Sequence, residues 1–207
     1  MNYTFTEHLH NYAVWTAARA VSRNFTDTKT IKIAIEKTGL KGLIDSKEVF
    51  TVDSFDCFHR ESANSIINYL KSVDQKLIDK ATYGRAAKII AIYIKTISVV
   101  RDSGISNLSK IAHPPIDRIL LTNAGKVYKD LGLNKINWTQ LTENKYFELI
   151  KKFRTTDTKH AYGLSLNNSF GSQFLYKQIP NLELDNNVIA TCEAASGSFK
   201  VALSNSL

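Results

Sequence analysis

Hydrophobic side chains recur every three or four positions along most of the first 160 residues, which is the period of an amphipathic α-helix. Alternation of the strand type is weak and confined to short segments near the C-terminus. Polar capping residues or glycines stand where the helices are expected to begin or end. The pattern predicts helices over residues 5–23, 28–38, 53–73, 84–100, 115–125 and 142–154.

The sequence His113-Pro114-Pro115 is the sharpest break in this pattern. Proline fixes φ and lacks a backbone N–H, so it suits the first turn of a helix, and we expect a helix to begin at Pro114 or Pro115. The periodic signal fades toward the C-terminus. There, residues 165–179 are expected to form one more helix, and residues 188–203 a small β-hairpin or a loose tail.

The expected architecture is an all-α fold with a single multi-helix domain. Residues 1–160 form the helical domain, and residues 161–207 form a C-terminal helix and tail packed on it. Several aromatic side chains fall on or near the apolar helix faces and are expected in the core. These aromatic residues are Tyr12, Trp15, Phe55 and Phe58.

Of the 207 residues, 43% are apolar and 22% are charged, which is typical of globular proteins and excludes intrinsic disorder. No stretch approaches the roughly 20 apolar residues that cross a bilayer, so we expect a cytoplasmic protein without membrane contact. Neither His8 with His10 nor Cys57 with His59 shares a helix face, so no metal or other cofactor is expected. The signatures of P-loop NTPases, Rossmann dehydrogenases and serine hydrolases are absent.

Positive charge is concentrated in the middle of the chain. Of the 27 Lys and Arg residues, sixteen lie at positions 76–160, where only seven Asp and Glu accompany them, whereas the first 75 residues have no net charge. A basic segment of this kind attracts polyanions, and nucleic acid is the expected partner. The alternative is a solvated surface in a lysine-rich protein. The pattern indicates no particular oligomeric state.

Candidate chemistry lies in this basic segment. A small-residue turn at Gly84 leads into the helix that carries Arg85 and Lys88, and N–H groups at such a helix start can approach a phosphate closely. The proline corner brings Asp117 to the start of the next helix, where its carboxylate is stabilised as an anion and can act as a base or an electrostatic stabiliser. His113 stands at the same corner. The hypothesis therefore requires Lys88, His113 and Asp117 to converge on one cleft.

Gly84 and Lys88, followed by Pro115 and Asp117, resemble the hairpin and the Pro-x-Asp corner of the helix-hairpin-helix DNA glycosylases, the group that includes the 8-oxoguanine glycosylases. Ala86 replaces the second glycine of that hairpin, and the resemblance covers only this part of the chain. It implies that Lys88 attacks the sugar C1′ of a flipped nucleotide, while Asp117 stabilises the sugar cation or activates the nucleophile. The implied partner is DNA rather than RNA. The same blocks are also similar to bacterial proteins with no assigned function.

Two further features bear on nucleic-acid chemistry. Arg118 and Trp138 are expected to contact nucleic acid, and Trp138, in a polar loop, is placed to stack on a base.

Arg154 and His160 resemble the motif of the all-α HEPN ribonucleases, in which the histidine is an acid or base and the arginine stabilises the phosphorane charge. The favoured hypothesis is a nucleic-acid-binding protein, with a divergent helix-hairpin-helix DNA glycosylase that acts on a flipped base as its specific form. A non-catalytic nucleic-acid-binding or host-defence protein and a HEPN-like ribonuclease are the alternatives.

Overall fold

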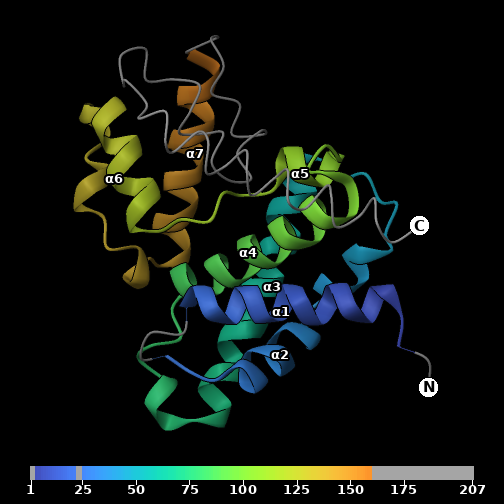
Figure 1. Ribbon diagram of the computed structural model, residues 1–207. Helices are drawn as coiled ribbons and strands as arrows, with labels where there is room; N and C mark the ends of the chain where they lie inside the picture. The colour runs from blue at the N-terminus through green and yellow to red at the C-terminus, as the bar shows by residue number, and fades with distance from the viewer. Residues whose placement is uncertain (1–2, 22–24, 160–207) are drawn as a thin grey trace, which may run out of the picture.

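The computed structural model describes residues 3–21 and 25–159, which form one all-α domain with no strand among them (Figure 1). The predicted fold class is confirmed. The α-helices are α1 (Phe5–Val21), α2 (Thr28–Glu36), α3 (Val52–Val73), α4 (Tyr83–Asp102), α5 (Asn107–Ile111), α6 (Arg118–Val127) and α7 (Glu143–Lys159). The 3-10 helices are η1 (Leu40–Ile44), η2 (Gln75–Leu77), η3 (Lys129–Leu131), η4 (Leu133–Lys135) and η5 (Trp138–Gln140). The helix and hairpin expected after residue 160 lie outside the described residues.

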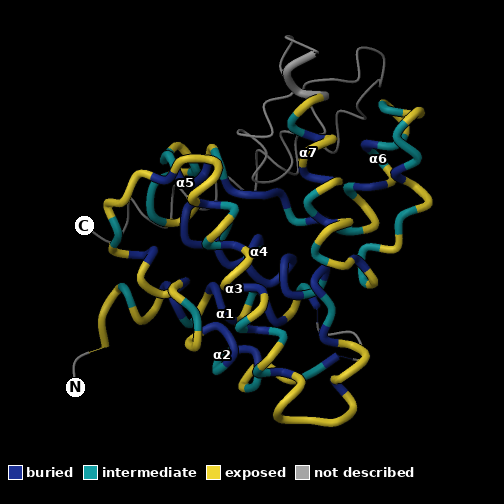
Figure 2. The backbone as a smooth tube through the Cα atoms, turned by 180° about the vertical axis from the view of Figure 1, so that it is seen from behind, coloured by how far each residue is buried: buried dark blue, intermediate teal, exposed yellow. Residues whose placement is uncertain are grey.

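Helix α4 runs through the centre of the domain, and the other long helices pack around it (Figure 1). It is buried along most of its length, whereas the outer helices alternate between buried and exposed positions in Figure 2. Both α1 and α3 pack against α4, and α2 contacts α1 and α3. A helix that is apolar almost all round requires such a central position.

Local capping fixes several helix ends where the sequence indicated them. Oδ1 of Asp27 accepts a 2.8 Å hydrogen bond from the N–H of Thr30 and so begins α2. After α4, Ser103 and Gly104 adopt left-handed backbone conformations, with φ of 56° and 75°. That conformation ends a helix, so the predicted break is confirmed.

The proline corner does not begin a helix, contrary to the sequence-based expectation. The chain stays non-helical through both prolines, and α6 begins at Arg118 with Asp117 as its N-cap. A residue that precedes proline is driven towards extended backbone, and His113 and Pro114 both stand in that position. Asp117 then supplies the side chain that caps the helix: its Oδ1 accepts a 2.9 Å hydrogen bond from the N–H of Leu120.

Helix α7 continues past the point where its periodic pattern fades. Residues 155–158, beyond the predicted helix end at residue 154, are helical. Tyr146, Ile150 and Phe153 bury the apolar face of α7, and once a helix is anchored in this way each added residue gains one hydrogen bond. No helix among the described residues is long and apolar enough to cross a membrane.

Two of the four aromatic residues expected in the core lie on the surface. Tyr12 and Trp15 of α1 are exposed, whereas Phe55 is fully buried and Phe58 packs against the core. The inward face of α1 is instead made largely of small residues such as Ala13, Ala17 and Ala18. Small side chains let α1 approach the rest of the domain closely, and the large rings beside them point outward.

Candidate functional site

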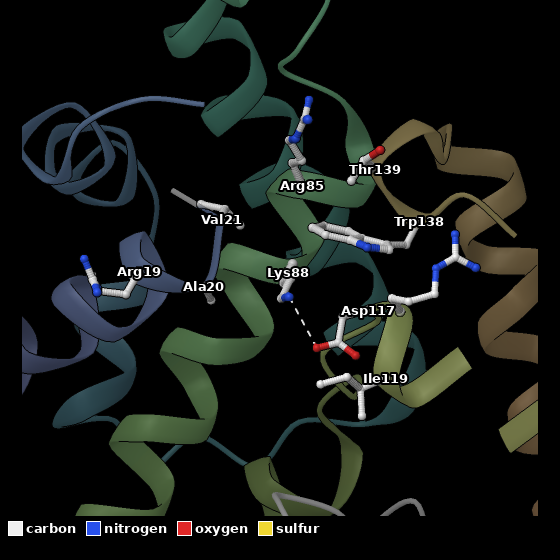
Figure 3. A pocket seen from close by; sticks show the side chains of 10 residues that line it. Arg19, Ala20, Val21, Arg85, Lys88, Asp117, Ile119, Trp138 and Thr139 are labelled. Atoms are coloured by element: carbon white, nitrogen blue, oxygen red, sulfur yellow. Dashed lines mark hydrogen bonds and ion pairs between the residues drawn. The ribbon is translucent and has the colours of Figure 1, made fainter. Parts of the chain in front are cut away.

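Four elements that are distant in sequence enclose a pocket of about 540 Å³. They are the end of α1, the first half of α4, the start of α6 and η5 (Figure 3). Small-molecule sites usually occupy about 300–1,000 Å³, so the volume suits a ligand of that size. Among the described residues, four cationic side chains and one carboxylate line the pocket, so its lining favours anions. The charged lining residues are Arg19, Arg85, Lys88, Arg118 and Asp117.

Lys88 and Asp117 face each other in this pocket, as Figure 3 shows. Lys88 belongs to the second turn of α4 and is only 9% exposed. Its Nζ lies 3.3 Å from Oδ2 of Asp117. An almost buried ammonium group requires a partner of this kind because an unpaired buried charge is strongly unfavourable. The structure thus brings together two of the three side chains that the sequence hypothesis required to converge.

The two carboxylate oxygens of Asp117 serve different neighbours. Oδ1 caps α6 through the N–H of Leu120, and Oδ2 faces the amine of Lys88. The cap fixes the orientation of the carboxylate, and the N-terminal end of α6 stabilises its negative charge. The local signal that starts α6 therefore also sets one side of the pocket.

Trp138 supplies an aromatic wall. Its ring centre lies 4.5 Å from Nζ of Lys88, within the range at which an indole face attracts a cation. The sequence suggested a polar loop here, but Trp138 begins η5 and is partly buried against the core. Its backbone is therefore held by the fold, and the ring keeps a defined place beside Lys88.

Gly84 has a packing role and does not line the pocket. An added Cβ would lie 1.9 Å from the carbonyl oxygen of Trp138, so only glycine lets η5 approach α4 this closely. The N–H of Gly84 donates a 3.1 Å hydrogen bond to the carbonyl of Leu141. This N–H was predicted to approach a phosphate, but it already has a partner within the protein. The hydroxyl of Thr82 donates a 2.7 Å hydrogen bond to the carbonyl of Thr139. The start of α4 thereby holds η5, and with it Trp138.

Arg85 and Arg118 add positive charge to the pocket. Arg85 donates a 2.7 Å hydrogen bond to the carbonyl of Lys80 and lies over the ring of Phe25, and burial lowers its pKa. Arg118 donates a 2.8 Å hydrogen bond to the carbonyl of Asn134. A guanidinium group has five N–H donors, so these contacts orient both side chains and leave donors for an anion.

His113 does not reach the pocket, although the sequence hypothesis grouped it with Lys88 and Asp117. It is buried, and its Nε2 lies 2.8 Å from Oδ1 of Asp56. The same carboxylate accepts two 2.8 Å hydrogen bonds from the guanidinium of Arg154. The side chain of His113 points into the core, where its ring contacts Asp56 and Tyr146, whereas the side chain of Asp117 points into the pocket.

A chain of hydrogen bonds continues from His113 through the core. Its Nδ1 lies 3.2 Å from the hydroxyl of Tyr146, whose oxygen lies 3.4 Å from Nε2 of His59. Nδ1 of His59 is 3.1 Å from the hydroxyl of Tyr83. These contacts are satisfied when both histidines are neutral with the proton on Nε2 and both tyrosines donate. Nη2 of Arg154, which lies 3.1 Å from Nε2 of His113, then donates to Asp56 and not to the ring. Burial lowers the pKa of both histidines, which favours this state.

We call this set the buried histidine network; it consists of Asp56, His59, Tyr83, His113, Tyr146 and Arg154. Most of these contacts are not predictable from the sequence. The one signal present was the spacing of Asp56 and His59, three residues apart and therefore on one helix face. The network links α3, the start of α4, the proline segment and α7. Because the proline segment ends at Asp117, the network also anchors one side of the pocket.

The predicted pairing of Arg154 with His160 stays a prediction. Arg154 is engaged by Asp56, and its predicted ribonuclease partner His160 lies outside the described residues. Within residues 3–21 and 25–159, no group of three or more His, Cys, Asp or Glu side chains is arranged to hold a metal ion.

Comparison with known proteins gives no further guide. The chain matches no family model, and no curated protein and no solved structure is significantly similar to it. The functional interpretation therefore depends on the geometry of the pocket.

Proposed function

We propose that this protein binds DNA and that the pocket receives one nucleotide beside Lys88 and Trp138. The observation that carries the proposal is the amine of Lys88 in an open cationic pocket, 3.3 Å from a carboxylate oxygen and 4.5 Å from an indole ring centre. A nucleotide has groups that complement this pocket. Its phosphate can pair with the arginines that line the pocket, and its planar base can stack on the indole ring.

We propose further that the protein is a divergent DNA glycosylase. Asp117 accepts a proton from the Lys88 ammonium group, which frees the lone pair on Nζ. Nζ then bonds to C1′ of the sugar, and the bond from C1′ to the base breaks with its electron pair leaving on the base. The departing base takes the proton from Asp117. The bond from C1′ to the ring oxygen opens, the oxygen takes a proton from Nζ, and Lys88 is left as a Schiff base with the sugar.

The local structure supports this division of roles. Lys88 projects from the buried helix α4, and its amine is paired with the carboxylate of Asp117. The direction from which the amine can approach the sugar is therefore fixed. Asp117 is oriented by its capping bond, so it can take the proton without first reorganising. Arg85 and Arg118 are each anchored to a backbone carbonyl and can hold the phosphates that flank the nucleotide.

Borohydride trapping tests the covalent step. Incubating the protein with abasic-site DNA and sodium borohydride should give a covalent adduct. Lys88→Gln should abolish the adduct. Asp117→Asn should slow its formation at least tenfold and leave the cap of α6, because the amide oxygen can still accept from Leu120. Lys110→Gln is the matched control, since Lys110 is an exposed lysine on α5 outside the pocket.

An adduct that survives Lys88→Gln would assign the nucleophile to another residue. No adduct and no base release with any base tested would remove the glycosylase function. Fluorescence anisotropy with labelled DNA separates that result from a failure to bind. Affinity should fall steeply with salt, and Arg85→Gln with Arg118→Gln should weaken it. Binding without product would support the non-catalytic alternative, and no binding even at low salt would contradict the whole proposal.

A further inference from the structure

The outward face of α1 carries a row of side chains that all end in planar groups. Positions 5, 8, 12, 15 and 19 repeat at helical spacing and lie opposite the buried face of α1. Phe5 is 62% exposed, Tyr12 46% and Trp15 53%. Each of the five residues ends in an aromatic ring or a guanidinium group. This planar row consists of Phe5, His8, Tyr12, Trp15 and Arg19.

The planar row is ordered and leads into the pocket. The rings of Tyr12 and Trp15 are stacked, with centres 6.2 Å apart and planes 17° from parallel. Arg19 follows on the same face and lines the pocket (Figure 3). A helix rises 1.5 Å per residue, so Tyr12 and Arg19 are ~10 Å apart along the axis. Bases stacked at ~3.4 Å cover that distance in about three nucleotides.

A lysine of α2 lies beside the planar row. Nζ of Lys32 is 3.0 Å from Oδ1 of Asn11 of α1 and 3.9 Å from Oε1 of Glu36. Single-strand binding surfaces combine aromatic rings for the bases with cations along the backbone path, and this surface has both.

We infer that the planar row is a stacking surface for unpaired bases next to the nucleotide that enters the pocket. The inference rests on the proposed DNA binding and adds the substrate class: single-stranded DNA, or DNA with an unpaired flank of about three nucleotides. In a duplex the base faces are covered by their neighbours and cannot reach these rings. Protein interfaces also use Trp, Tyr and Arg, but this row continues into a cationic pocket, and a nucleic-acid strand matches both.

The chain has two tryptophans, one on each surface, which permits a direct test. In Trp138→Phe the remaining emission reports on Trp15 and the planar row. In Trp15→Phe it reports on Trp138 and the pocket. Titration with the oligonucleotide (dT)8 should quench both reporters, because a stacked base quenches indole fluorescence. Thymidine monophosphate should quench only Trp138, because it is too short to reach from the pocket to Trp15.

A second measurement compares affinities without relying on fluorescence. Tyr12→Ala with Trp15→Ala should weaken (dT)8 binding about tenfold or more and leave the weak binding of thymidine monophosphate unchanged. Ile105→Ala is the control, since Ile105 is 73% exposed and outside both surfaces.

The outcomes separate the two proposals. Quenching of Trp138 without any response of Trp15 would contradict the stacking surface and leave the pocket in place. No response of either tryptophan, together with no anisotropy change, would contradict DNA binding itself. If Trp15 instead responds to protein concentration alone, and sedimentation shows a dimer that Tyr12→Ala with Trp15→Ala dissociates, the planar row is a contact between copies of this chain and the inference is wrong.

Discussion

The pocket and the buried histidine network use similar residue types but differ in how far each charge is matched. In the network, every ionisable group has a protein partner, and burial lowers the pKa of its histidines. Among the described residues that line the pocket, four are cationic and one is a carboxylate, which pairs with Lys88, and solvent has access. The matched cluster stabilises the fold, whereas the excess of positive charge among the described pocket residues favours an external anion. A histidine beside a carboxylate therefore indicates function only when some of its bonding capacity is left for a ligand.

Asp56 shows how tightly the network is matched. Burial alone would raise the pKa of its carboxyl group, but hydrogen bonds from Arg154 and His113 outweigh this effect and hold the pKa well below its ordinary value. The carboxylate is thus charged at any physiological pH and joins three separate parts of the chain. This role is structural, and it makes the network sensitive to the loss of a single member.

The largest expected effect is the loss of the Asp56 carboxylate. Asp56→Ala should lower the free energy of unfolding by about 3–5 kcal/mol, because it leaves the Arg154 guanidinium and the His113 ring without their acceptor. Lys88→Gln, the matching change in the pocket, should cost only about 1 kcal/mol, since Asp117 remains partly exposed and still caps α6. Urea denaturation of both variants measures the difference. Equal losses would show that the two clusters do not differ as described.

A smaller effect is expected from Gly84→Ala, which changes the support of the pocket without touching its charges. The new Cβ would meet the carbonyl oxygen of Trp138, so η5 must move, at a cost of about 2 kcal/mol. The displacement should also weaken ligand binding by moving Trp138 away from Lys88. Gly42→Ala is the control, because no heavy atom lies within 4 Å of its added Cβ. Equal stability of the two variants would contradict the close packing of η5 on α4.

A pH dependence that comes from the network is expected as well. Burial lowers the pKa of His59 and His113 in the folded protein, so below about pH 6.5 the unfolded chain takes up protons that the folded chain does not. The free energy of unfolding should therefore fall on acidification, by up to about 1.4 kcal/mol per pH unit for each histidine. Urea denaturation from pH 7.5 to pH 5 measures the slope.

His113→Gln should reduce that slope, while His8→Gln, a change at an exposed histidine, should leave it unaltered. Some slope will remain in His113→Gln, because burial also lowers the pKa of His10. A flat profile in the unaltered protein would show that the network histidines are not held neutral in the core.

Periodicity predicted the long helices well because each has one face that must be buried. It did not show which face of α1 is buried. Tyr12 and Trp15 were predicted to lie in the core, but the buried face is the neighbouring stripe of small residues. It also misjudged the proline corner. Two signals competed there, a proline suited to the first helical turn and an Asp suited to the cap, and the restriction on residues before proline decided in favour of Asp117.

The pairing of Lys88 with Asp117 was predicted from their spacing and the family resemblance, and the structure places the two side chains together. The network was not predicted, because its hydrogen bonds join residues far apart in the sequence. His113 and Asp56 are separated by 57 positions, and Tyr146 and His59 by 87. No local pattern predicts which distant helix a buried histidine will meet. For the same reason, His113 was assigned to the nearest acidic residue in the chain, Asp117.

The double use of Asp117 has one more consequence. A ligand that draws Oδ2 away from Lys88 should also pull on Oδ1, which caps the first turn of α6, so we expect ligand binding in the pocket to change how often that turn opens. Leu120 is uncharged and does not line the pocket, but its amide proton is held by Asp117. We therefore expect this proton to report on ligand binding. Its rate of exchange with solvent deuterium registers the state of a cavity that it never enters.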